Sequence, residues 1–234
     1  MSDEGYRFDP KFDWWTDDHY ANYEKVKGMF GGREGLRFLE VGIFEGRSTI
    51  WFCENVLTGP RCRYFAIEPD PAPNMAHNFD LLRERTDVNL MHIPDYSERV
   101  LPKMAFERNR IDLGYLDGDH NAQGNLRDAV MVWELLKVGG LMLFDDYEME
   151  ATDPWHYISH KEFSEHPRAN FQHPRAAIDA FLSIYRGLYE KVIDNFQVGI
   201  VKTVELGAKN LDHGDESQGE NGEGKFEYHA KKGA

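Results

Sequence analysis

Acidic side chains gather directly after two short apolar runs of the sequence. They are Asp117 and Asp119, with His120 beside them, after residues 111–116, and Asp145 and Asp146 after residues 141–144. If the two runs are neighbouring parallel strands, their carboxyl ends meet at one sheet edge and bring four carboxylates together. Unpaired carboxylates repel one another, whereas a hard divalent cation such as Mg²⁺ binds them and keeps water ligands that a substrate oxygen can replace. The pattern therefore predicts a magnesium-type site, and turn residues that bind nothing are the alternative.

A glycine-bearing turn follows an earlier apolar run, residues 37–41. Gly42 and Gly46 allow the backbone to approach a ligand closely. Their Gly-x-x-x-Gly spacing differs from the Gly-x-Gly-x-x-Gly pattern of dinucleotide enzymes, and Glu40 and Glu45 would repel a pyrophosphate. We therefore expect a ligand that carries an ammonium or sulfonium group rather than a phosphate.

A further acidic residue, Glu68, follows the next run, residues 64–67. A carboxylate at the end of the second strand of such a sheet can accept hydrogen bonds from both ribose hydroxyls of a nucleoside. A positively charged nucleoside without a phosphate is S-adenosylmethionine, which we predict as the cofactor. One alternative is an NAD(P)-dependent oxidoreductase, although it needs the missing glycine pattern. A second alternative is a non-catalytic module that binds S-adenosylmethionine without methylating anything.

Alternating strands and helices must position these residues. Five apolar runs, residues 37–41, 64–67, 90–93, 111–116 and 141–144, alternate with stretches of helical character, of which 125–137 is the clearest. Residues 189–193 and 198–203 form two further strand-like runs around a turn. This order predicts an α/β fold: a doubly wound, Rossmann-like, mostly parallel sheet with a C-terminal antiparallel hairpin and helices on both faces.

The chain divides into three parts. Residues 1–35 form an aromatic extension with one helix over 18–29, in which Trp14 and Trp15 are expected to pack against the sheet edge. Residues 36–205 form the cofactor-binding domain, with a lid-like insertion over 147–173. Residues 206–234 are nearly without apolar side chains and are expected to be a disordered acidic tail.

Composition narrows the range of partners. The 234 residues include 27 Lys and Arg against 41 Asp and Glu, a net charge of −14, which argues against nucleic acids and anionic membranes as partners. The two cysteines are too few for a disulfide scaffold, no secretion signal is evident, and no apolar run approaches the ~18 residues of a membrane span. We therefore expect a cytoplasmic protein, and its oligomeric state stays open.

These motifs together resemble those of class I S-adenosylmethionine-dependent methyltransferases, in the small branch with a DG[SD]H loop and a DDY strand end. The resemblance covers residues 12–202 and rests on residues 39–48, 67–70, 115–120, 135–140 and 144–147. It implies a set of cofactor-binding residues: Glu40, Gly42, Phe44, Gly46, Ser48, Glu68, Asp95, Ser97 and Asp117. Within this set Glu40 and Gly42 line the methionine end of the cofactor, Glu68 binds the ribose, and Asp95 and Ser97 lie near the adenine.

Metal-dependent O-methyltransferases of this fold act on catechols and sugars. The resemblance to them implies that Asp117, Asp145 and Asp146 hold the metal and that Asp119 or His120 is the catalytic base. We favour His120 slightly, because an imidazole titrates near neutral pH. The expected function is metal-assisted O-methylation of a small hydroxyl compound of sugar or phenol type.

Overall fold

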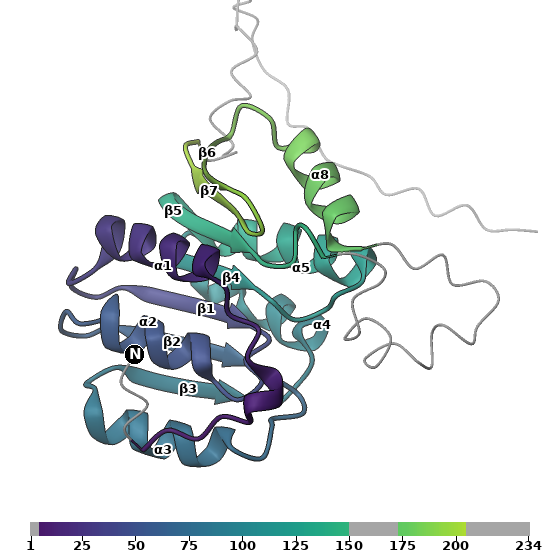
Figure 1. The fold of residues 1–234 in the computed structure, drawn as a ribbon. Helices are drawn as coiled ribbons and strands as arrows, with labels where there is room; N and C mark the ends of the chain where they lie inside the picture. Colours follow the sequence, from purple (N-terminus) through teal and green to yellow (C-terminus); the bar gives the residue numbers. More distant parts are fainter. Residues whose placement is uncertain (1–4, 150–172, 205–234) are drawn as a thin grey trace, which may run out of the picture.

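A seven-stranded sheet forms the centre of the fold in the computed structural model, which describes residues 5–149 and 173–204 (Figure 1). The strands are β1 (Arg37–Val41), β2 (Arg63–Ile67), β3 (Asn89–Ile93), β4 (Ile111–Leu116), β5 (Leu136–Phe144), β6 (Tyr189–Asp194) and β7 (Val198–Lys202). Their order is β3-β2-β1-β4-β5-β7-β6. The first five strands are parallel, and β7 pairs antiparallel with both β5 and β6. The predicted mostly parallel sheet with a C-terminal hairpin is confirmed.

Helices cover both faces of this sheet. The described helices are η1 (Pro10–Phe12), α1 (Asp17–Phe30), α2 (Arg47–Asn55), α3 (Met75–Arg85), α4 (Ser97–Val100), η2 (Leu101–Glu107), α5 (Ala122–Leu135) and α8 (Pro174–Ile184). One hydrophobic core joins α1, α2 and α3 to one face of the sheet, and a second core joins η2, α5 and α8 to the other face (Figure 1). Neighbouring residues of β1 serve different cores, since Phe38 belongs to the first and Leu39 to the second. The strand is buried from Phe38 to Val41 because both faces are covered.

The boundary between α5 and β5 differs from the sequence prediction. The helix was expected over residues 125–137, ending at the glycine pair, but it ends at Leu135 and β5 begins at Leu136. Leu136 pairs with Ile111 of β4, and the amide of Arg110 donates to the carbonyl of Leu135. Strand pairing with β4 therefore ends the helix before the glycines are reached.

The segment before α1 lies across the domain and leads to the carboxyl ends of the strands (Figure 1). The hydroxyl of Tyr6 donates to Glu54 of α2 at 2.7 Å, and the backbone of Arg7 exchanges two hydrogen bonds of 2.8 Å with Asn78 of α3. The amide of Asp9 donates to Glu45 at 3.0 Å. This segment is thus fixed to α2, α3 and the loop after β1.

Several sequence predictions concern other parts of the chain. Most of the predicted insertion over 147–173 and the whole predicted tail over 206–234 lie outside the described residues. Cys53 and Cys62 are buried free thiols. In the described ranges, no helix combines the length and the apolar character that crossing a membrane requires.

Candidate active site

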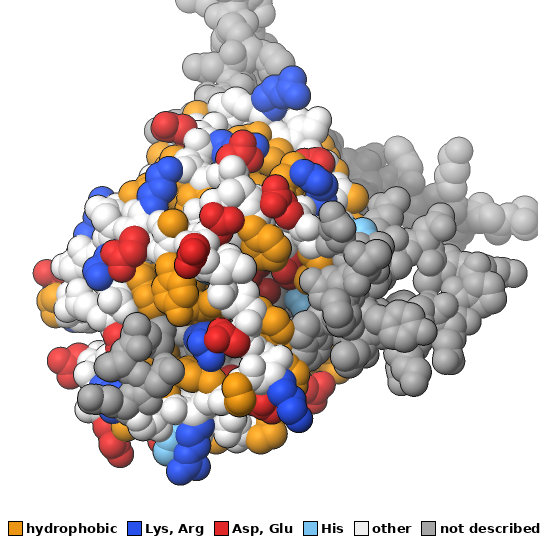
Figure 2. Space-filling view, in the orientation of Figure 1, with side chains coloured by type: hydrophobic (Ala, Val, Ile, Leu, Met, Phe, Trp, Pro, Cys, Tyr) orange, Lys and Arg blue, Asp and Glu red, His pale blue; other side chains and the backbone are white. Residues whose placement is uncertain are grey.

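A cavity of about 620 Å³ opens at the carboxyl ends of β1, β2, β4 and β5. Gly42 follows β1 and Asp117 follows β4, so the cavity includes the point where the strand order reverses. Doubly wound sheets bind their ligands at this place, because the loops diverge there to opposite sides. Carboxylate atoms and a histidine ring are visible inside the hollow near the centre of the face in Figure 2.

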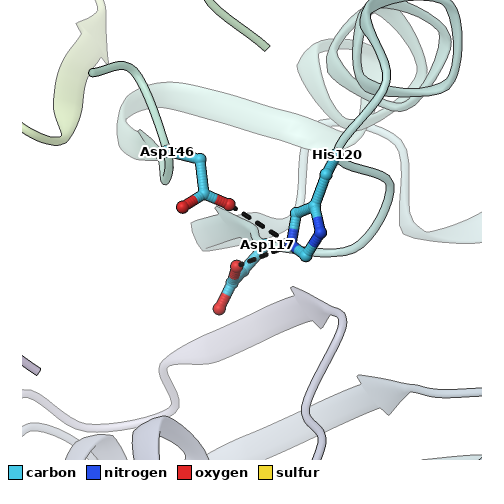
Figure 3. Close-up of side chains that lie close together, drawn as sticks. All are labelled: Asp117, His120 and Asp146. Atoms are coloured by element: carbon cyan, nitrogen blue, oxygen red, sulfur yellow. Dashed lines mark ion pairs between the residues drawn. The ribbon is translucent and has the colours of Figure 1, made fainter. Parts of the chain in front are cut away.

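Two carboxylates and one imidazole converge in this cavity (Figure 3). His120 Nε2 lies 3.3 Å from Asp146 Oδ2 and 4.0 Å from Asp117 Oδ1. One ligand atom from each of the three residues lies within 4.8 Å of the others. Burial, followed by the charges of Asp145 and Asp146, raises the pKa of Asp117 well above its usual value. A positive charge bound at this triad would relieve the repulsion among its carboxylates.

Asp145 lines the cavity but is not part of this cluster, and its role as a metal ligand stays a prediction. Its carboxylate accepts hydrogen bonds from Tyr115 Oη at 2.6 Å and Gln197 Nε2 at 3.1 Å and pairs with His19 Nε2 at 3.5 Å. Burial alone would raise the pKa of Asp145, but the hydrogen bond and charge of His19 and the bond from Tyr115 outweigh it and lower the pKa. Asp146, which has a left-handed φ of +59°, supplies the carboxylate that joins the triad.

The two candidate bases have different surroundings. Asp119 lines the cavity, but its Oδ1 accepts the amide of Asn121 at 3.0 Å and also the side-chain amide of that residue. Asn121 in turn accepts the amide of Gly124 and caps α5. Asp119 thus supports the start of α5, which was the alternative to a catalytic role, whereas His120 faces the carboxylates.

The loop after β1 is shaped for close approach. Gly42 has a φ of +84°, and a Cβ atom there would lie 2.0 Å from the carbonyl oxygen of Asp117. Glu68 Oε2 accepts the amides of Ile43 and Phe44 at 3.1 and 3.2 Å, which fixes the loop beside a carboxylate that lines the cavity. The glycine is therefore required by the contact between the β1 and β4 loops, and Glu68 retains lone pairs for a ligand.

Residues 39–147 match the family model described as a methyltransferase domain. This match covers 109 of the 234 residues and shows that they are similar to a methyltransferase domain. The domain is 27% identical over 135 residues to the uncharacterized protein R132 of Acanthamoeba polyphaga mimivirus, and the aligned part is 56% of this chain and 59% of that protein. The chain thus spans about three fifths of the length of this curated relative.

Solved structures share the fold of this chain at low sequence identity. An rRNA methylase from Streptococcus thermophilus is 11% identical with a TM-score of 0.51, and 81% of this chain and 98% of that chain are covered. A candidate O-methyltransferase from Klebsiella pneumoniae is 15% identical with a TM-score of 0.54, with 83% and 84% covered. At these identities the likeness concerns the fold alone.

Most of the cofactor-binding residues predicted for the methyltransferase line its cavity. Those that do are Gly42, Phe44, Ser48, Glu68, Ser97 and Asp117. Gly46, in contrast, packs its backbone against the ring of Phe79 at the start of α2, with a φ of +82°. Asp95 does not line the cavity either, since its Oδ1 accepts the amide of Tyr96 and pairs with Arg99 at 3.3 Å, and its place near the adenine stays a prediction.

Glu40, predicted to line the methionine end of the cofactor, lies elsewhere in the structure. It is fully buried and does not line the cavity, because its side chain points under the loop toward α2. The hydroxyls of Ser48, Thr49 and Tyr64 all donate to its carboxylate. Burial raises the pKa of Glu40 from 4.5 to about 7. Glu40 thus holds the first turn of α2 to the sheet.

An aromatic wall, defined here as Phe12, Trp14 and Phe44, borders the methyltransferase cavity and was missed by the sequence analysis. The three ring centroids lie 5.2 to 5.5 Å apart. Trp15 lines the cavity as well, so both tryptophans do more than pack against the sheet edge. The high aromatic content of the first 35 residues was the available signal, but no local pattern showed which surface these rings would face.

The cavity of the methyltransferase is strongly acidic. Its lining includes seven carboxylate residues: Glu45, Glu68, Glu98, Asp117, Asp119, Asp145 and Asp146. Two arginines also line it, and each is paired with an acid, Arg47 with Asp13 at 3.3 Å and Arg127 with Glu98 at 2.9 Å. The field inside the cavity therefore favours cationic ligands over anionic ones.

Proposed function

We propose that this protein transfers the methyl group of S-adenosylmethionine to a hydroxyl of a small compound, assisted by a divalent cation. The observation that carries the proposal is the triad of Asp117, His120 and Asp146, which lies in the same cavity as Gly42 and Glu68. A methyl donor and an activated oxygen must meet within a few ångströms for transfer to occur, and one cavity holds the groups suited to both.

The residues around Gly42 fit the cofactor. The loop at Gly42 lines the cavity, and the carboxylate of Glu68 can accept the ribose hydroxyls. S-adenosylmethionine carries a sulfonium and an ammonium group, and both are attracted by the carboxylates of the lining. A pyrophosphate would meet the same carboxylates and be repelled, which disfavours the NAD(P) alternative.

The triad fits a divalent cation. It offers two carboxylates and one imidazole with ligand atoms within 4.8 Å of one another, a donor set that suits Mg²⁺ or Mn²⁺ when carboxylates dominate. We assign Asp117 and Asp146 as the ligands and His120 as the base, because Asp119 supports α5. A bound cation would lower the pKa of the acceptor hydroxyl.

The reaction then balances as a direct transfer. The acceptor oxygen gives up its proton to His120 Nε2 and attacks the sulfonium methyl carbon. The carbon–sulfur bond breaks as the carbon–oxygen bond forms, which yields a methyl ether and S-adenosylhomocysteine. Glu68 orients the cofactor, and the aromatic wall helps to exclude water from the site.

Size and charge indicate the acceptor class. A cavity of about 620 Å³ that must also hold the cofactor leaves room for a small molecule. Its acidic lining and the net charge of −14 oppose nucleic-acid phosphates, although one structural neighbour is an rRNA methylase. An uncharged or cationic hydroxyl compound, of sugar or phenol type, fits best.

The test is methyl transfer from labelled S-adenosylmethionine to a panel of phenols and sugars, with added Mg²⁺ or with a chelator. We expect transfer that the chelator abolishes and that Asp146→Asn reduces at least a hundredfold. The variant His120→Gln should bind Mn²⁺ normally yet lose activity, since it lacks the proton acceptor. Full activity of Asp146→Asn in the presence of chelator would refute the metal role.

Two further outcomes concern the rest of the proposal. Loss of Mn²⁺ binding in His120→Gln would make His120 a ligand instead of the base. Cofactor binding without transfer to any member of the panel would favour the non-catalytic module.

A further inference from the structure

His19 comes to the site from α1, which lies before the residues that match the methyltransferase domain model. It is 3% exposed and lines the cavity. Its Nδ1 accepts the amide of Thr16 at 3.1 Å as part of the N-terminal cap of α1. Because Nδ1 is an acceptor there, the proton is on Nε2, which faces Asp145 Oδ1 at 3.5 Å.

Asp145 receives support from several separate elements. Tyr115 of β4 and Gln197, next to β7, donate to its carboxylate at 2.6 and 3.1 Å, and His19 faces it from α1. All of these side chains are buried. The position of the Asp145 carboxylate is therefore fixed by residues far apart in the sequence.

The fixed carboxylate in turn holds the next residue of the chain. The amide of Asp146 donates to Asp145 Oδ1 at 3.0 Å, the same oxygen that His19 faces. Asp146 has a φ of +59°, a left-handed conformation that residues other than glycine adopt only when their surroundings enforce it. This conformation directs its carboxylate toward His120 and Asp117 (Figure 3).

We propose that His19 is a positioning residue of the methyl-transfer site. It holds Asp145, and Asp145 holds the turn that places the Asp146 carboxylate in the triad. The inference rests on the proposed function, because it assigns the triad to a divalent cation. It adds that the aromatic N-terminal region is part of the catalytic apparatus, since α1 supplies one contact that sets the geometry of the site.

A matched pair of variants tests this chain of contacts. In His19→Gln the side-chain amide reaches as far as Nε2 and can still donate to Asp145. In His19→Asn the amide replaces Nδ1 but is too short to reach Asp145. Val26→Ala is the control for loosening of α1, because Val26 packs in the core from the same helix and its apolar side chain bonds none of the groups that hold Asp145.

The readouts are the dissociation constants of Mn²⁺ and of S-adenosylmethionine, measured on the full chain, together with kcat and KM. We expect His19→Asn to weaken Mn²⁺ binding 10- to 100-fold and to lower kcat, as loss of an outer contact to a metal site does. The affinity of His19→Asn for S-adenosylmethionine should stay within about twofold of the wild-type value, because the contact acts on the metal site alone. His19→Gln should restore most of the loss, and Val26→Ala should leave Mn²⁺ affinity unchanged.

Several results would overturn the inference. They are unchanged Mn²⁺ affinity in His19→Asn, an equal loss in His19→Gln, or an equal loss in Val26→Ala. Circular dichroism checks that all three variants are folded. If His19→Asn does not fold, the test depends on His19→Gln instead. A Mn²⁺ affinity of His19→Gln that differs from that of the wild type by more than tenfold would then overturn the inference. Failure of the wild-type protein to bind Mn²⁺ would instead refute the metal part of the proposed function.

Discussion

Glu40 makes the stability of the protein fall as the pH rises through neutrality. Its pKa is 4.5 in an ordinary solvated carboxyl and about 7 in the folded protein, chiefly because it is buried. Between these pH values the folded state keeps a proton that the unfolded state has lost. The contribution of Glu40 to the free energy of unfolding is therefore fully present below pH 4.5 and lost as the pH rises to 7.

The size of this effect follows from the two pKa values. A difference of about 2.5 units at 1.36 kcal/mol per unit corresponds to about 3 kcal/mol. Of this, about 2.5 kcal/mol is lost between pH 5 and pH 8, because the unfolded group is already largely ionised at pH 5. Glu40→Gln removes the titrating group and leaves an amide that the hydroxyls of Ser48, Thr49 and Tyr64 can still bond.

The assay is urea unfolding of the wild type and of Glu40→Gln at pH 5, 6, 7 and 8. The difference between the two proteins isolates Glu40 from other groups with raised pKa values, such as Asp117. We expect the wild type to lose about 2.5 kcal/mol relative to the variant across this range. Parallel stability curves, or a wild type that gains stability relative to the variant as the pH rises, would refute the reasoning.

Three more predictions concern the cavity. Gly42→Ala places a methyl group against the Asp117 carbonyl, so calorimetry should show loss of S-adenosylmethionine binding while circular dichroism shows an intact fold. An affinity for S-adenosylmethionine within threefold of the wild-type value would contradict this prediction. Trp14→Leu should raise the KM of the acceptor several-fold and leave cofactor affinity unchanged in steady-state assays, whereas a shift in cofactor affinity alone would assign the wall to the cofactor. Asp119→Ala should lower the free energy of unfolding by about 1 kcal/mol and retain methyl transfer, and loss of activity without loss of stability would make Asp119 the base.

The sheet was predictable because its strands carry their own signal. Parallel strands covered on both faces are mostly apolar, and residues 37–41 and 111–116 were predicted with the bounds they have in the structure. The end of α5 was not predictable in the same way. The helical pattern continues beyond Leu135, and only the pairing of Leu136 with Ile111, 25 positions earlier in the sequence, ends the helix.

The candidate site was predictable where it depends on strand ends. Asp117 and Asp146 meet because β4 and β5 are neighbours, which the order of runs already indicated. The contacts of Asp145 were not predictable, since its partners come from α1, β4 and the residue beside β7. The contribution of His19 and of the aromatic wall also depends on where a distant segment packs, and no spacing in the sequence encodes that.

Calorimetric titration of the wild-type protein with S-adenosylmethionine is the most direct test of the central claim. We predict saturable binding at one site per chain, competition by S-adenosylhomocysteine, and no binding of NAD or NADP. Absence of S-adenosylmethionine binding, or saturable binding of a pyridine nucleotide at the same site, would contradict the account.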